Sequence, residues 1–455
     1  MTQADTYRSF LSSKSQMERN SGFEPITLPD TMFPFQQSLC DWSIRHGRSA
    51  AFADCGLGKT LIQLVWAENV VRKTNKPVLI LTPLSVGPQT VREAAKFDLE
   101  ATQVRDGRHK GGIVVTNYER LHYFDSSDFA GVVCDESSIL KNFNGSTKAA
   151  VTEFMRTVPY RLLCTATAAP NDYYELGTSS EALGHLGYQD VLGRFFKEDI
   201  IKDYLGWGRK TYRFRGHAET PFWRWVCSWS RSLRRPSDMG FDDDGFELPT
   251  LEEREIIINA SCPREGMLFP IPASNLHDQR EERRMTIESR CHKAADIANH
   301  HVGHTVVWCH LNDEADLCEK LINGAVQVSG SMRDEEKEER LTAFSNGEIP
   351  TLVTKPKIGC WGLNWQHCDN VVTFASHSFE QYYQSVRRCW RFGQRNPVTV
   401  SVVCSDGEMG ILANLRRKAA AADRMFRSVV THMRQAEEIS PIRNFAETER
   451  MPTWL

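Results

Sequence analysis

Short apolar runs rich in β-branched residues recur along this chain, and patterns typical of helices separate them. The first set of runs covers residues 50–53, 78–82, 113–116, 131–134 and 161–165, and the second covers 305–309, 326–329, 351–354, 371–374 and 398–402. Alternating strands and helices predict parallel sheets with helices packed on them. Because 455 residues exceed what one core usually accommodates, the two sets predict two α/β lobes.

The expected organisation has five parts. They are an N-terminal polar extension (1–28), a first lobe (29–185), a helical insertion with the inter-lobe linker (186–290), a second lobe (291–408), and a C-terminal brace helix with a tail (409–455). The insertion differs in composition, being aromatic and basic over 204–235 and acidic over 242–244. Residues 409–436 contain strong helix formers and no proline, which predicts a helix packed back on the lobes.

Cysteine usage and hydropathy bear on the compartment. The 13 cysteines include no C-x-x-C pair, and residues 1–21 lack the apolar core of a signal peptide. No apolar run approaches the roughly 20 residues that span a bilayer. We therefore expect an intracellular, cytoplasmic protein with no membrane partner. The net charge of −3 gives no overall attraction to polyanions, so nucleic-acid binding would need a local basic surface.

A glycine-rich segment lies between an apolar strand and a helical pattern, which is the setting of a phosphate-binding loop. Its candidate nucleotide-binding residues are Gly56, Leu57, Gly58, Lys59 and Thr60. The glycines would let backbone N–H groups approach phosphate oxygens at the start of the helix. Lys59 would neutralise the β- and γ-phosphates, and Thr60 would bind Mg²⁺. A simple glycine turn before a helix is the alternative.

Two adjacent carboxylates, Asp135 and Glu136, end another apolar strand. Ligands of parallel sheets gather at this end of the strands. Asp135 would bind Mg²⁺, and Glu136 would orient and deprotonate the attacking water. An acidic pair at a strand end is more often a solvated turn, but the upstream Lys59 and Thr60 favour an ATPase site.

The order of these motifs resembles that of superfamily 2 helicases, and within them the Swi/Snf-type branch of DNA translocases. The resemblance covers about 29–436 and is carried by a D-x-G-L-G-K-T loop (54–60), an acidic motif with a trailing L-K-N (135–142), L-R-R (233–235) and Q-x-x-x-R-x-x-R-x-G-Q (384–394). Ser138 stands where the family generally has histidine. Because the chain is compact for this branch, it resembles most the stand-alone members found in bacteria and their viruses.

The resemblance implies two tandem RecA-like lobes and assigns further site residues. Phe35 and Gln36 would contact the adenine, Gly362 and Asn364 would adjoin the nucleotide, and Gln384, Arg388 and Arg391 would complete the site from the second lobe. Thr165, Ala166 and Thr167 would couple ATP state to movement. The implied contacts with nucleic-acid backbone are Pro83, Thr116, Tyr118, Lys141, Gly330, Ser331, Thr354 and Lys355.

Arginines suit the transition state of phosphoryl transfer, because a guanidinium matches phosphate oxygens in two places. An arginine finger contributes about 10³- to 10⁵-fold in rate. Arg388 and Arg391 are three residues apart and would share a helix face or its end. A solvated basic helix is the alternative.

Cations alternate with aromatic residues in the insertion. Arg209, Arg213 and Arg215 are candidate nucleic-acid contacts, whereas we expect the tryptophans at 223, 225 and 229 to pack inward. The histidines at 300–310 fit no common zinc spacing.

These patterns together predict a DNA-dependent ATPase that uses ATP and Mg²⁺. It would translocate along mostly double-stranded DNA without reading bases, and would displace bound protein or remodel branched DNA. We expect a monomer that a protein partner recruits. A strand-separating helicase on DNA or RNA is one alternative, and a non-hydrolysing nucleic-acid clamp is another.

Overall fold

The computed structural model describes residues 21–84, 86–202, 208–259, 276–359 and 364–439. The first lobe is built on a seven-stranded parallel sheet with the order β3-β4-β2-β5-β6-β1-β9. Its strands are β1 (Arg48–Ala53), β2 (Val78–Thr82), β3 (Ala101–Gln103), β4 (Ile113–Asn117), β5 (Gly131–Asp135), β6 (Tyr160–Cys164) and β9 (Ser230–Leu233). Strands β2, β4 and β5 are buried along their whole length, which explains their continuous apolar sequence.

Helices cover both faces of this sheet, and each face has its own apolar core. The helices are α2 (Pro34–His46), α3 (Lys59–Thr74), α4 (Gly87–Lys96), α5 (Ser146–Thr157), α6 (Leu176–Leu183), α7 (Tyr188–Phe195) and α8 (Glu219–Trp229). Short 3₁₀ turns follow β4 and β5, including η1 (Tyr118–Tyr123) and η3 (Ser137–Lys141).

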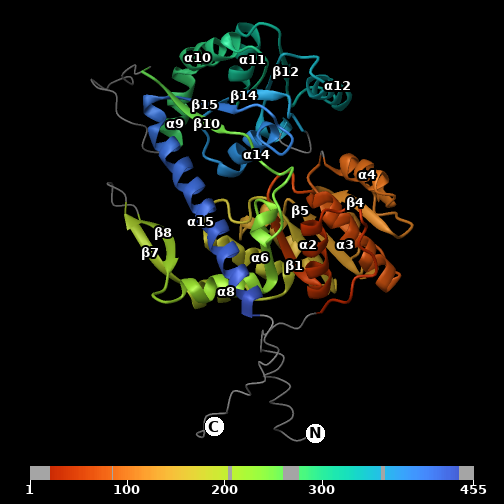
Figure 1. The fold of residues 1–455 in the computed structure, drawn as a ribbon. Coiled ribbons are helices and arrows are strands. Elements are labelled where there is room, and N and C mark those ends of the chain that lie inside the picture. The colour runs from red at the N-terminus through yellow and green to blue at the C-terminus, as the bar shows by residue number, and fades with distance from the viewer. Residues whose placement is uncertain (1–20, 85, 203–207, 260–275, 360–363, 440–455) are drawn as a thin grey trace, which may run out of the picture.

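The second lobe repeats this plan with a six-stranded parallel sheet in the order β10-β15-β14-β11-β13-β12. The strands are β10 (Leu251–Ile258), β11 (His304–Trp308), β12 (Ala325–Val328), β13 (Thr351–Thr354), β14 (Cys368–Phe374) and β15 (Val398–Ser405). The helices are α9 (Leu276–Met285), α10 (Ile287–His300), α11 (Asn312–Leu321), α12 (Asp334–Ser345), α13 (Pro356–Gly359) and α14 (Phe379–Cys389). The two lobes confirm the predicted tandem RecA-like fold (Figure 1).

The segment between the lobes contains strands as well as the predicted helices. Strand β9 joins the edge of the first sheet and β10 the edge of the second, while β7 (Phe196–Lys202) and β8 (Gly208–Phe214) form an antiparallel hairpin beside α8. Trp223 and Trp229 are buried, so the prediction that they pack inward is confirmed.

Helix α15 (Met409–Ile439) runs from the second lobe down the side of the first (Figure 1). Near its start, Leu415 packs on Phe379 of α14. Further along, Phe426 and Met433 are buried in the core of the first lobe. One continuous helix therefore joins both lobes, as the sequence predicts. Among the described residues, no helix is long and apolar enough to cross a membrane.

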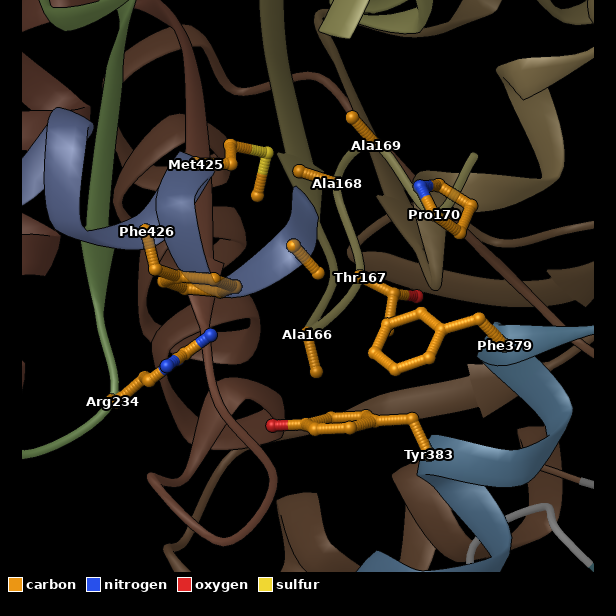
Figure 2. A pocket seen from close by; sticks show the side chains of 11 residues that line it. Ala166, Thr167, Ala168, Ala169, Pro170, Arg234, Phe379, Tyr383, Met425 and Phe426 are labelled. Atoms are coloured by element: carbon orange, nitrogen blue, oxygen red, sulfur yellow. The ribbon is translucent and has the colours of Figure 1, made fainter. Parts of the chain in front are cut away.

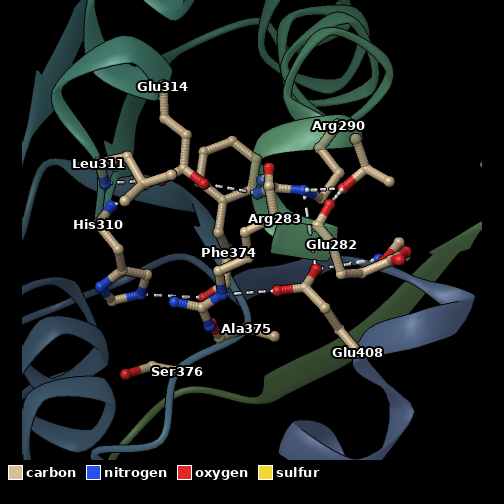
Figure 3. A network of polar contacts seen from close by, with 12 residues as sticks. Glu282, Arg283, Arg290, His310, Leu311, Glu314, Phe374, Ala375, Ser376 and Glu408 are labelled. Atoms are coloured by element: carbon tan, nitrogen blue, oxygen red, sulfur yellow. Dashed lines mark hydrogen bonds and ion pairs between the residues drawn. The ribbon is translucent and has the colours of Figure 1, made fainter. Parts of the chain in front are cut away.

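Buried ion pairs connect the turn before α15 to helices α9 and α10 of the second lobe (Figure 3). Arg290 of α10 forms an ion pair with Glu314 at 2.6 Å and lies 3.7 Å from Glu408, and Arg283 pairs with Glu408 at 2.7 Å. Removing one partner of such a buried pair costs about 3–5 kcal/mol. The network therefore holds α9, α10 and the turn before α15 as one unit.

Candidate nucleotide site between the lobes

The predicted phosphate loop connects β1 to α3. Gly56 (φ 88°) and Gly58 (φ 75°) adopt left-handed conformations that favour glycine. The ammonium of Lys59 donates to the carbonyl oxygens of Ala53 and Asp54 at 2.9 and 3.2 Å. The lysine is thus held over the loop, where it can exchange these carbonyl oxygens for phosphate oxygens.

Gln36 touches the same loop from α2. Its side-chain nitrogen donates to the carbonyl of Leu57 at 2.9 Å, and a β-carbon on Gly58 would lie 2.2 Å from that nitrogen. Phe35, expected beside the adenine, is instead 2% exposed and packs edge-on against Phe246. Phe33 is 52% exposed and is the aromatic side chain at this position that a base could reach.

Asp135 lies buried at the end of β5 and is held by residues from two elements. Gln63 of α3 donates to one carboxylate oxygen at 2.7 Å, and the hydroxyl of Tyr118 donates to the backbone carbonyl of Asp135 at 2.6 Å. Burial raises the pKa of Asp135, and the Gln63 hydrogen bond and the charge of Lys59 oppose the rise. Thr60 is the second residue of α3, and its hydroxyl and the Asp135 carboxylate are oxygen groups of the kind that Mg²⁺ prefers.

Glu136 adopts a left-handed backbone conformation (φ 51°, ψ 51°), which is uncommon for a residue other than glycine. Its carboxylate accepts a hydrogen bond from Thr165 at 3.2 Å. Burial raises the pKa of Glu136 to about 7, with Asp135 and Glu380 adding to the rise and Lys59 and Arg388 opposing it. A carboxylate that titrates near neutral pH is suited to act as a general base.

Helix α14 of the second lobe brings Gln384 and Arg388 to this carboxylate. The two residues are four apart and share a helix face. The charge of Arg388 acts on Glu136. Gln384 is 2% exposed, lines the same inter-lobe cleft as Glu136, and has no hydrogen-bond partner for its side-chain nitrogen among the described residues. That amide can therefore hold a water molecule or a phosphate oxygen beside the base.

Arg391 follows the end of α14 and lies against the phosphate loop. A β-carbon on Gly56 would be 3.7 Å from its guanidinium and 2.9 Å from the ring of Phe392. Its guanidinium also donates to the side chain of Asn364, and burial lowers the pKa of Arg391 to about 10. Asn364 is thus next to the site, while Gly362 lies outside the described residues.

Two of the residues expected to couple ATP state to movement, Ala166 and Thr167, lie where both lobes meet α15 (Figure 2). The hydroxyl of Thr165 contacts Glu136 and also accepts from the backbone N–H of Thr167 at 3.0 Å. Ala166 and Thr167 line a small hollow together with Phe379, Tyr383 and Phe426. One short segment therefore touches the base, α14 and α15.

The expected nucleic-acid contacts divide into accessible and buried residues. Pro83, Tyr118 and Lys141 line an inter-lobe cleft of about 520 Å³ that also reaches Glu136. Gly330, Ser331 and Lys355 line a second hollow of about 380 Å³ on the second lobe.

Several residues that were expected to contact nucleic acid are instead buried or hydrogen-bonded to other groups of the protein. The side chains of Thr116 and Thr354 are buried, and Thr354 donates to the carbonyl of Val328 at 2.9 Å. The Tyr118 hydroxyl is bound to Asp135. The motifs fix where these residues lie along their strands, but tertiary packing turns their side chains inward.

The insertion arginines lie on the hairpin beside α8. Arg213 pairs with Asp199 at 2.9 Å across the two strands, and Arg215 donates to the carbonyl of Phe196 at 2.8 Å. The side chain of Arg209 lies outside the described part. The hairpin therefore uses Arg213 and Arg215 in its own structure.

Sequence reasoning missed four contributors to this site. Gln63 lies one helical turn after Lys59, a spacing that could have suggested its role. Three side chains of α14 contact the first lobe, namely those of Tyr383, Arg387 and Glu380. No local sequence pattern predicts contacts between residues that lie more than 200 positions apart in the sequence.

Comparisons with known proteins find a matching family domain and similar proteins. Residues 289–393 match the helicase conserved C-terminal domain. Protein p41 of Acyrthosiphon pisum secondary endosymbiont phage 1 is 24% identical, over 86% of this chain and 96% of its own length. The uncharacterized ATP-dependent helicase YqhH of Bacillus subtilis is 30% identical over 195 residues, 39% of this chain and 34% of that protein.

A solved structure supports the fold. Dbp5 of S. cerevisiae, bound to RNA and ADP BeF₃, has a TM-score of 0.52 and 12% identity, and the match covers 89% of this chain and 98% of that one. Residues 289–393 therefore resemble a helicase C-terminal domain, and the two lobes share the fold of Dbp5.

Proposed function

We propose that this protein is a DNA-stimulated ATPase that translocates along mostly double-stranded DNA and displaces bound protein or remodels branched structures. The observation that carries the proposal is the composite site. Lys59, Asp135 and Glu136 come from the first lobe, and α14 brings Gln384 and Arg388 from the second. Because the site is complete only when the lobes meet, a cycle of hydrolysis changes the lobe arrangement.

The residues fit a triphosphate with its metal ion. Lys59 and the glycine turn would bind the β- and γ-phosphates, and Thr60 and Asp135 would hold Mg²⁺, which neutralises charge on the transferring group. Glu136 would accept the proton of the attacking water. Arg388, and Arg391 beside the loop, would stabilise the charge on the phosphoryl group. A clamp that only binds would not need this whole set.

Two features of the sequence favour duplex DNA as the track. The L-K-N tail at 140–142 and the R-x-G-Q ending at 391–394 resemble the Swi/Snf-type branch. A strand-separating helicase would use the same ATPase residues, so the two activities differ in their substrate. RNA is bound in the Dbp5 structure, so RNA belongs among the substrates tested.

The test is an ATPase assay at fixed salt with blunt duplex DNA, single-stranded DNA, branched DNA and RNA. We expect duplex or branched DNA to stimulate most, and triplex displacement without unwinding of a tailed duplex. Preference for single strands together with unwinding would favour the helicase alternative. Lys59→Ala and Glu136→Gln should abolish stimulated turnover and preserve DNA binding, and full turnover in either variant would exclude the assigned site.

A further inference from the structure

The carboxylate of Glu380 connects α14 of the second lobe to the first lobe. One oxygen accepts a hydrogen bond from the hydroxyl of Ser138, and the other pairs with the ammonium of Lys141. Ser138 and Lys141 both belong to η3, directly after Glu136. The side chains of Glu380 and Lys141 are 12% and 30% exposed, so the pair is partly shielded but within reach of a ligand in the cleft.

Helix capping does not explain this contact. Glu380 is the second residue of α14, where a negative charge is favourable beside the helix N-terminus. However, Ser378 already caps the helix by accepting from the backbone N–H of Gln381 at 3.3 Å. The carboxylate of Glu380 points instead to the neighbouring lobe.

The surrounding cleft has nearly balanced charges. Its lysines are Lys141, Lys337 and Lys357, and its carboxylates are Glu119, Glu136, Asp334 and Glu380. Carboxylate and phosphate oxygens are both strong acceptors for an ammonium and a hydroxyl. A backbone phosphate carries one negative charge, as Glu380 does. It can therefore replace Glu380 as the partner of Lys141 and Ser138.

The same helix face carries the catalytic groups. Glu380, Gln384 and Arg388 follow at four-residue intervals on α14 and therefore share one side of it. While Glu380 is bound to η3, it fixes where this face sits relative to Glu136. Its release allows α14 to move and to carry Gln384 and Arg388 with it.

We propose that Glu380 is an internal competitor of the nucleic acid, holding Lys141 and Ser138 until a backbone phosphate displaces it. This inference rests on the proposed function and specifies how nucleic acid regulates that site. Glu380 acts as a positioning residue, because it reaches the reacting groups through α14. Ser138, which departs from the family pattern, supplies the second donor.

The test is Glu380→Gln in the full chain, with blunt duplex DNA as the probe. The substitution keeps the shape and removes the charge. We expect the half-stimulating DNA concentration to fall about fivefold and the DNA-free ATPase rate to rise by a similar factor, as for a partly exposed ion pair. Fluorescence anisotropy without nucleotide should show correspondingly tighter DNA binding. The KM for ATP should stay near that of the wild type.

Two further variants separate this role from general damage. Ser138→Ala removes a donor from Glu380 and equally from the incoming phosphate, so it should change the half-stimulating DNA concentration less than Glu380→Gln does. Glu253→Gln removes a carboxylate that binds Tyr382 of the same helix outside the cleft, and should change neither quantity.

The results that would contradict the role of Glu380 can be distinguished from the result that would contradict the proposed function. If duplex DNA stimulates the wild type and Glu380→Gln has an unchanged or higher half-stimulating concentration, the competitor role is excluded. If Glu253→Gln reproduces the effect of Glu380→Gln, the role is likewise excluded. If no nucleic acid stimulates the wild type, the proposed function fails and the inference fails with it.

Discussion

Arg387 of the second lobe forms a buried ion pair with Asp54 of the phosphate loop, with 2.9 Å between guanidinium nitrogen and carboxylate oxygen. The two side chains are 1% and 5% exposed. Tyr383 donates to the other oxygen of Asp54 at 2.5 Å, and Arg387 also donates to the carbonyl of Cys55 at 3.1 Å. The second lobe therefore holds the phosphate loop through residues other than the expected arginine fingers.

Replacing Arg387 should loosen the contact between the lobes. Arg387→Met leaves Asp54 charged and without its cationic partner, a situation that costs about 3–5 kcal/mol when the carboxylate stays buried. We expect the lobes to separate instead. Without nucleotide, the radius of gyration from small-angle scattering should increase, and the KM for ATP should rise.

A matched control uses an arginine in a different setting. The ion pair of Arg427 with Asp423 lies within α15, and the arginine is 78% exposed. Arg427→Met should therefore change neither quantity. Adding Asp54→Asn to Arg387→Met should restore part of the compactness. An unchanged radius and KM in Arg387→Met would rule out this role.

Arg388→Ala should stop chemistry without preventing nucleotide binding. The charge of Arg388 acts on Glu136, and an arginine finger at such a site contributes about 10³- to 10⁵-fold in rate. We expect the kcat to fall by at least about 10³-fold, with a Kd for a fluorescent ATP analogue close to that of the wild type. The exposed Arg417 provides the control substitution. A normal kcat would remove Arg388 from the catalytic set.

Gln63→Leu should weaken the use of magnesium. Gln63 orients the carboxylate of Asp135, and loss of such a supporting hydrogen bond typically costs about 10- to 100-fold in metal affinity or activity. A magnesium titration of the ATPase should therefore shift to higher concentration by that factor. Gln89→Leu, which affects a glutamine bonded to Glu93 on α4, serves as the control. Coincident titrations of Gln63→Leu and wild type would contradict the assignment.

His185 should make the fold sensitive to acid. Burial lowers the pKa of His185 to about 4, although its ring is hydrogen-bonded to the carbonyl of Arg48. The unfolded chain binds a proton near pH 6.5, whereas the native state does so only near pH 4. Stability is therefore complete above pH 6.5 and falls as the pH drops toward 4, by at most about 3 kcal/mol from this group.

Thermal unfolding of His185→Gln at pH 7 and pH 5 checks this expectation. The decrease in Tm from pH 7 to pH 5 should be smaller for the variant than for the wild type. His46, whose pKa burial also lowers to about 4, remains in both proteins and keeps part of the dependence. An identical pH response in both proteins would show that His185 is not responsible.

Most of the strands that sequence patterns predicted are buried along nearly their whole length, as β2 and β13 are. Besides the hairpin strands β7 and β8, three strands gave no such signal, for physical reasons. Strand β3 has three residues, β9 is the polar run Ser230–Leu233, and β10 is an edge strand with the sequence L-E-E-R-E-I-I-I. An edge strand with a solvated face tolerates charges.

In the site as well, residues in sequence motifs could be predicted, whereas contacts between distant parts of the chain could not. Lys59 and Asp135 occur in motifs whose expected chemistry follows from local sequence and spacing, whereas the role of Arg388 is implied by the family resemblance. Contacts such as those of Arg387 depend on how two separately folded lobes meet. The inward turn of Tyr118 depends on packing around Asp135.

Helix α15 limits how the two lobes can move. It is fixed near Leu415 by α14 and near Met425 by the first lobe's core, ten residues or about 15 Å of helix apart. Separating the lobes along a straight line would expose apolar side chains such as Phe426 to water. Any movement of one lobe relative to the other is therefore expected to be a rotation about α15, with a reach set by that span.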